Sequence, residues 1–160
     1  MAGDGPRLGS MILAAPDPAL DTWFARELLR LQHAAYRTEA ELVGDDRLPP
    51  LQDDDVTLPA WRGRYVVSWR GVELVGAIAW RDHGDHLDID RLMVGPESRR
   101  QGVGTTLLQA VLDWADGRPV VVSTGRENAP AVALYVRHGF AVGDDEQVPP
   151  GIWITHLRRA

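Results

Sequence analysis

A double arginine followed by two glycines is the stretch of this 160-residue chain whose chemistry is easiest to name. Arg99 and Arg100 offer permanent positive charge and forked N–H donors, while Gly102 and Gly104 lack a Cβ, so an anion can approach the backbone closely. A helix that begins here leaves its first N–H groups without internal partners and carries partial positive charge at that end. These residues predict a site for a pyrophosphate, although glycines and arginines at a helix start also occur in plain turns.

The neighbouring segments predict that this loop lies between a strand and a helix. Residues 87–94 are rich in branched apolar side chains, which is typical of a buried strand, and Gly95-Pro96 ends it because proline has no N–H to donate. Beyond the loop, apolar residues recur at helical spacing at Val103, Leu107, Leu108, Val111, Leu112 and Ala115. The expected order is therefore strand, anion loop and helix.

The remaining patterns predict an α/β chain with an antiparallel front half and alternating strands and helices behind it. Residues 64–69 and 72–80 flank Arg70-Gly71 and are expected to form a hairpin, and the β-branched run at residues 120–124 predicts another strand. Further strands are expected at residues 10–15, 140–142 and 152–157. Residues 144–150 are expected to form a turn, and residues 128–138 a helix. A long helix, interrupted near Tyr36, is expected from Asp17-Pro18 to Gly44. Its core stripe would comprise Leu20, Phe24, Leu28, Leu31, Ala35 and Leu42.

The acidic run Asp53-Asp54-Asp55 has two interpretations. Consecutive carboxylates could bind a hard cation, but such a site needs ligands that converge from spaced positions. They could equally cap a short helix through Leu58. We favour the cap, expect no metal, and take this loop as an acidic wall of a substrate pocket.

Composition excludes several mechanisms. The chain has no cysteine, so disulfides, thiolate metal sites and a cysteine nucleophile are ruled out. All 17 lysine and arginine residues are arginine, which rules out a Schiff-base mechanism and a Walker-type phosphate loop, since both need a lysine. A net charge of −6 disfavours a nucleic-acid partner, and no apolar run approaches the roughly 20 residues of a membrane span. We expect a cytoplasmic protein with a flexible leader at residues 1–9 and a single domain at residues 10–160.

Three motifs in order resemble one known family. Residues 99–104 match the Arg/Gln-x-x-Gly-x-Gly/Ala acetyl-CoA signature of the GNAT superfamily of N-acetyltransferases, and residues 89–94 look like that family's fourth strand. The run from Asn128 to Tyr135, with Gly139-Phe140 after it, is similar to the family's second cofactor motif. The resemblance covers the chain well from Arg64 to its end and only loosely before that. It implies the acyl-CoA N-acyltransferase fold, with a mixed, mostly antiparallel central sheet flanked by helices.

The resemblance also implies how a cofactor is held. Acetyl-CoA would be the co-substrate, and its pantetheine arm would pair like an extra strand with the fourth strand and hydrogen-bond Asn128, which can also cap its helix. An N–H of Val94 or its neighbour would polarise the thioester. The implied cofactor residues are Leu92, Met93, Val94, Arg99, Arg100, Gln101, Gly102, Val103, Gly104, Thr105 and Asn128.

Catalysis of acyl transfer to an amine needs an acid for the departing thiolate and a base for the ammonium. Tyr135 matches the tyrosine that protonates the coenzyme A sulfur in many family members, or it is simply a core residue. Asp88 and Asp90 alternate onto one face of the fourth strand, where family members with a carboxylate base often carry glutamate. The shorter aspartate favours a water relay over direct contact, and one or both aspartates could instead bind Arg91 or a neighbouring loop. None of the five histidines is singled out by a motif.

These patterns lead to the prediction of a GNAT-like N-acetyltransferase. The acetyl group would pass directly to a primary amine of a small molecule or protein in a ternary complex, because no cysteine and no apparent Ser-His pair offers an acyl-enzyme. A homodimer is possible for the fold. The alternative is a non-catalytic acyl-CoA-binding or regulatory module, while a nucleotide-phosphate hydrolase is opposed by the missing lysine.

Overall fold

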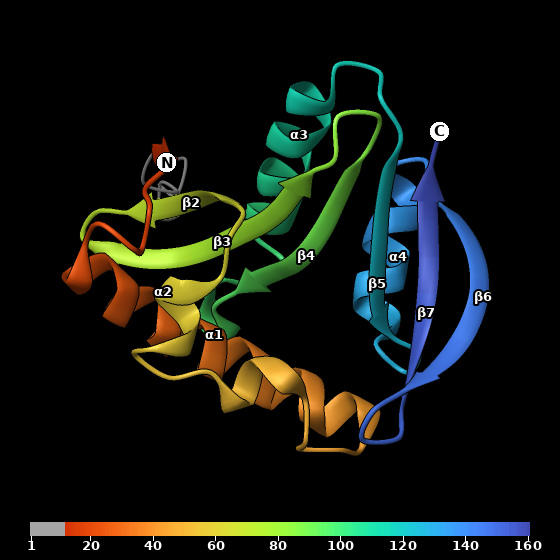
Figure 1. Ribbon diagram of the computed structural model, residues 1–160, viewed down its shortest axis with the longest axis horizontal. Coiled ribbons are helices and arrows are strands. Elements are labelled where there is room, and N and C mark those ends of the chain that lie inside the picture. The colour runs from red at the N-terminus through yellow and green to blue at the C-terminus, as the bar shows by residue number, and fades with distance from the viewer. Residues whose placement is uncertain (1–11) are drawn as a thin grey trace, which may run out of the picture.

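The computed structural model describes residues 12–160, which form a seven-stranded sheet flanked by helices (Figure 1). The strands are β1 (Ile12–Ala14), β2 (Arg64–Arg70), β3 (Glu73–Asp82), β4 (Leu87–Val94), β5 (Val120–Gly125), β6 (Ala141–Val148) and β7 (Ile152–Arg159). The helices are α1 (Thr22–Val43), α2 (Thr57–Ala60), α3 (Val103–Ala115) and α4 (Ala129–Arg137), with single 3₁₀ turns at Pro49–Gln52 and Pro96–Ser98.

The strand order is β1-β2-β3-β4-β5-β7-β6, and all neighbours are antiparallel except β4 and β5. This confirms the predicted mixed, mostly antiparallel sheet. α1 and α2 cover one face, where Phe24 and Leu28 pack against Ala77 and Met93. α3 and α4 cover the other face, where side chains such as Leu107 pack on the opposite surface of the same strands. Both layers exclude water from the central strands, which is the main source of stability for such a fold.

β4 and β5 diverge, and this divergence positions the functional site. Their parallel pairing runs only from Leu87 opposite Val120 to Ile89 opposite Val122. Beyond Ile89, β4 continues along β3, and among residues 12–160 no strand pairs with its other edge (Figure 1). β4 also contains one extra residue, Asp90. Its neighbours Ile89 and Arg91 pair with Trp80 and Ala79, which are adjacent in β3, so Asp90 has no residue opposite it. This bulge interrupts the strict alternation that the sequence suggests.

The long helix differs from its prediction at three places. α1 begins at Thr22, because the Asp21 carboxylate accepts the Phe24 N–H at 3.0 Å and caps it there. Leu20 therefore lies before the helix and is 86% exposed, and Leu42 is 42% exposed, so neither belongs to the buried core stripe. The helix runs unbroken to its predicted end at Gly44.

The predicted turn at residues 144–150 is wrong over most of its length. β6 continues from Ala141 to Val148 and pairs with β7 through a bulge between Val142 and Asp145. β6 is an edge strand whose side chains are almost all exposed, so it has no apolar alternation by which the sequence could reveal it. The cross-strand pairs of β6 and β7 become part of the site described below.

Two predictions lie partly outside the described residues. The flexible leader at residues 1–9 and the start of the first strand at Ser10 fall among residues 1–11 and are not described. The assignment of residues 10–160 to a single domain stays a prediction. Within residues 12–160, no helix is both long and apolar enough to cross a bilayer.

Candidate active site

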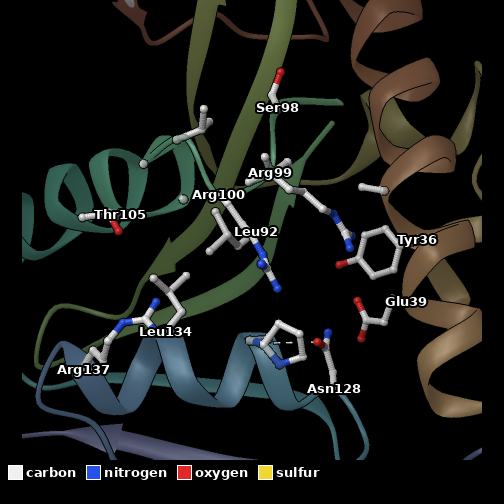
Figure 2. A pocket seen from close by; sticks show the side chains of 17 residues that line it. Tyr36, Glu39, Leu92, Ser98, Arg99, Arg100, Thr105, Asn128, Leu134 and Arg137 are labelled. Atoms are coloured by element: carbon white, nitrogen blue, oxygen red, sulfur yellow. Dashed lines mark hydrogen bonds between the residues drawn. The ribbon is translucent and has the colours of Figure 1, made fainter. Parts of the chain in front are cut away.

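A cavity of about 600 Å³ lies where β4 and β5 diverge, between the start of α3 and the length of α4 (Figure 2). Nine of the eleven predicted cofactor residues line it: Leu92, Val94, Arg99, Arg100, Gly102, Val103, Gly104, Thr105 and Asn128. The other two do not. The Met93 side chain is fully buried in the core beneath α1, and the Gln101 amide donates to the Glu97 carbonyl at 3.3 Å.

The start of α3 forms the cationic side of this cavity. Gly102 has a φ of +78°, a conformation that glycine adopts without steric penalty, and it turns the loop into the helix. The first hydrogen bond of the helix joins the Thr106 N–H to the Gly102 carbonyl. The N–H groups just before Thr106 therefore make no hydrogen bond within the helix and are available to an anion. Arg99 and Arg100 reach the cavity from the loop, and Arg137 reaches it from α4 (Figure 2). Arg137 was not anticipated, since it lies on α4, distant in sequence from the loop.

A second cavity of about 260 Å³ adjoins the first and has a different character. The two share five lining residues: Tyr36, Glu39, Leu92, Asn128 and Ala131. The second cavity adds the polar side chains of Asp90, Ser123 and Tyr135, together with apolar side chains of β7 and of the segment after α1. The first cavity, which is lined by arginines, thus adjoins a second cavity that is lined by carboxylates, hydroxyls and phenols.

Tyr135 lies at the floor of the second cavity. Its side chain is 3% exposed and packs on Phe140, with ring centroids 5.3 Å apart. Burial raises the pKa of the Tyr135 phenol far above its usual value, and the negative charge of Glu39 raises it further. The phenol therefore keeps its proton at neutral pH and can donate it.

Glu39 and Tyr36 are functional candidates that sequence reasoning missed. α1 approaches the end of β5 so closely that a Cβ at Gly125 would lie 2.6 Å from Val43 Cγ1 and 3.4 Å from Glu39 Oε1. The bare glycine thus allows Glu39 to sit between the two cavities, facing Asn128 (Figure 2). Burial raises the pKa of Glu39, although hydrogen bonds to Asn128 and Gly125 act to lower it. Burial also raises the pKa of the Tyr36 phenol.

The two predicted base candidates occupy different places. Asp90 lines the second cavity, but its carboxylate accepts the Arg91 Nε–H at 2.6 Å and lies 3.7 Å from Arg81. Asp88 lines neither cavity, and burial, with the charge of Asp90 nearby, raises its pKa. The ion pair with Arg91 that the sequence left open is therefore made by Asp90.

Within the acidic run, Asp54 has the capping role that the sequence favoured. None of the three aspartates lines either cavity, so they do not form the expected acidic wall there. Asp54 caps the short helix α2 by accepting the N–H groups of Val56 and Thr57 at 2.9 and 2.8 Å. Asp53 instead accepts from Arg91 at 3.1 Å and holds it beneath α1. Among residues 12–160, no three histidine, aspartate or glutamate side chains gather as metal ligands would.

One polar cluster joins three strands and was not visible in the sequence. Ser123 Oγ of β5 lies 2.7 Å from His156 Nδ1 of β7, and His156 Nε2 lies 2.7 Å from a carboxylate oxygen of Glu146 on β6. The sequence shows no Ser-His pair because these residues are 33 positions apart. Only the pairing of β5 with β7, and of β7 with the unpredicted part of β6, brings them together.

Comparison with known proteins agrees with this geometry. The sequence matches the description "Acetyltransferase (GNAT) family" over residues 25–140. The chain belongs to the GNAT family.

Individual GNAT relatives and structures add detail. The chain is 34% identical to the UPF0157 protein YqkA of Bacillus subtilis over 82% of this chain but only 38% of that protein, so it spans less than half of YqkA. It is 31% identical to the N-alpha-acetyltransferase RimI of Mycobacterium tuberculosis, over 64% of this chain and 67% of RimI. The paia N-acetyltransferase from Thermoplasma acidophilum, solved in complex with coenzyme A, has the same fold, with a TM-score of 0.69 at 14% identity over 91% of this chain and 98% of that one.

Proposed function

We propose that the protein transfers an acetyl group from acetyl-CoA directly to a primary amine of a small molecule or protein, in a ternary complex. The observation that carries this proposal is the pair of adjoining cavities at the divergence of β4 and β5. One cavity is lined by three arginines and the start of a helix, which suits a pyrophosphate. The other contains carboxylates and a buried phenol, which suit an ammonium group and proton transfer.

The cofactor is proposed to span the first cavity. Its pyrophosphate would bind the N–H groups at the start of α3, with Arg99 and Arg100 supplying charge. Its pantetheine arm would extend along Leu92 and Val94, where the edge of β4 has no partner strand, and Asn128 would contact the arm from α4. The thioester then lies near the boundary between the two cavities.

The chemistry follows from what lies at that boundary. A neutral amine attacks the thioester carbonyl, whose oxygen is stabilised by an N–H of Val94 or its neighbour. The tetrahedral intermediate expels the coenzyme A thiolate, which takes its proton from the Tyr135 phenol. The proton that the nitrogen loses as the amide forms then restores the phenol. Glu39 and Asp90 place negative charge beside the amine and so favour a cationic acceptor. Asp88, which lines neither cavity, would contribute only through its charge.

Two measurements, made one after the other, test the proposed function. Calorimetry with acetyl-CoA, longer acyl-CoAs and free nucleotides should show micromolar binding of acetyl-CoA. Thiol release is then followed with a panel of amines that includes an alanine-initiated peptide, spermidine, free amino acids and an aminoglycoside. The peptide is included because a relative is an N-alpha-acetyltransferase. Binding without thiol release from any amine would favour the non-catalytic module, and no binding would overturn the proposal.

A further inference from the structure

The polar cluster of Ser123, His156 and Glu146 has the composition of a proton relay. We propose that it removes the proton from the acceptor ammonium in the acetyl transfer proposed above, on which this inference rests. Ser123 is the member of the cluster that lines the second cavity. His156 and Glu146 extend from it towards solvent, with side chains 44% and 58% exposed. The cluster therefore connects the acceptor cavity with the bulk.

The sheet holds the three residues on one face at neighbouring positions. Ser123 is directly opposite His156 in the antiparallel pairing of β5 with β7. Glu146 is opposite Ile154, which lies two residues from His156 and so on the same face. Since all three side chains project from paired strands, the two 2.7 Å hydrogen bonds are set by the register of the sheet.

The carboxylate determines the direction in which the proton moves. An ionised Glu146 can only accept, so His156 must carry a hydrogen on Nε2 to bond it. In the neutral ring Nδ1 is then an acceptor, and the Ser123 hydroxyl donates its hydrogen to Nδ1. The Ser123 oxygen keeps lone pairs for an N–H of a substrate in the cavity.

The proton step balances without any further reagent. The acceptor ammonium gives a proton to Ser123 Oγ as the hydroxyl proton moves to His156 Nδ1, which leaves a neutral amine, an intact serine and an imidazolium. The positive charge moves from the substrate to His156, where the Glu146 carboxylate stabilises it. The imidazolium, being half-exposed, returns its proton to solvent. The reaction as a whole converts ammonium and thioester into amide, thiol and one released proton.

The two aspartates of β4 that were predicted as bases are less suited by position, and Glu39, which lines both cavities, is tested alongside the relay. The Asp90 carboxylate is already engaged by Arg91 and Arg81, so it is a fixed negative charge near the amine. Asp88 lines neither cavity. Glu146 approaches His156 from β6. On β7 itself, the charged side chain on the same face as His156 is that of Arg158, two residues further along the strand.

The test compares three variants with the wild type, using the amine of the panel that the wild type acetylates fastest. Ser123→Ala and His156→Gln remove two members of the relay, and His86→Gln is the control, because His86 pairs with Asp85 in the turn before β4, outside both cavities. At pH 7 we expect kcat to fall about a hundredfold for both relay variants and to stay unchanged for the control. Calorimetric affinity for acetyl-CoA should be kept in all three, which also shows that they are folded.

The pH profile separates a relay from a structural role. Above the amine's own pKa, about 8 for an α-amino group, the substrate is already neutral and needs no base. The deficit of both relay variants should therefore shrink as the pH rises past that value, whereas a structural defect would persist. Two further variants, Asp90→Asn and Glu39→Gln, are measured in parallel. The relay would be overturned by a constant deficit, by unaffected relay variants in an active enzyme, or by a shrinking deficit found only in Asp90→Asn or Glu39→Gln. A wild type that acetylates no amine would instead overturn the proposed function, and the relay with it.

Discussion

Alanine at Gly104 is expected to stabilise the fold and to weaken acetyl-CoA binding, two effects of opposite sign. A Cβ there would lie 3.4 Å from Leu134 Cδ2 and 3.7 Å from Val94 Cγ2, which is ordinary van der Waals contact. Residue 104 is in the first turn of α3, where alanine exceeds glycine in helix propensity by about 0.5–1 kcal/mol. For a chain of this size we expect the midpoint of thermal unfolding to rise by roughly 2 °C.

The same methyl group projects into the cavity where the pyrophosphate is proposed to bind. Both neighbours of the new Cβ, Leu134 and Val94, line that cavity. If the methyl displaces the phosphate from one backbone N–H, the loss is that of a charge-assisted hydrogen bond, about 1.5–3 kcal/mol. The dissociation constant for acetyl-CoA should then rise by roughly 10- to 150-fold. Scanning calorimetry measures the first effect, and titration calorimetry measures the second.

Gly102→Ala is the matched comparison. No atom lies within 4 Å of a Cβ at Gly102, but its φ of +78° is strained for alanine by about 1–2 kcal/mol. This variant should therefore unfold at a lower temperature, in contrast to Gly104→Ala. If Gly104→Ala is stabilised and still binds acetyl-CoA with wild-type affinity, the pyrophosphate does not lie at the start of α3. If its unfolding midpoint falls, the steric argument itself is incorrect.

Three further variants test the remaining parts of the site. Tyr135→Phe should lower kcat about a hundredfold with acetyl-CoA affinity kept, because only the proton donor is removed. Glu39→Gln should raise the unfolding midpoint at pH 7 and raise KM for the amine. Burial raises the pKa of Glu39, so ionising it disfavours the folded state at neutral pH. Arg91→Met should destabilise the fold by about 2–3 kcal/mol, because the Arg91 side chain is 9% exposed and its loss leaves Asp53 without its arginine and Asp90 with only the more distant Arg81.

Each of these expectations has an outcome that contradicts it. Wild-type turnover in Tyr135→Phe would remove the phenol from the mechanism. The gain in Glu39→Gln should vanish below the unfolded pKa of about 4.3, where the glutamate is protonated in both states. A gain that persists at pH 3.5 would show that its origin is not ionisation. Unchanged urea unfolding of Arg91→Met would show that the ion pairs beneath α1 contribute little.

The sequence predicted the cofactor side of the site more fully than the acceptor side. Strand, loop and α3 were placed within a residue or two, because each is encoded by adjacent residues: an apolar run, a proline, two glycines and a helical stripe. Glu39 and Arg137 gave no such signal. They belong to helices whose surface residues are ordinary until the sheet brings α1 and α4 to the same cavity.

What the sequence determined by itself is the fold class, the glycine loop at the start of α3 and the exclusion of cysteine and lysine chemistry. These follow from local periodicity, backbone freedom and composition, which need no knowledge of distant contacts. Only the tertiary structure decided that β4 and β5 diverge after Ile89 and that Asp90 is bound by arginines. It alone also brought Ser123 and His156 within 2.7 Å. Register and strand order arise from packing of the whole sheet. Residues tens of positions apart therefore become neighbours although no local sequence pattern indicates it.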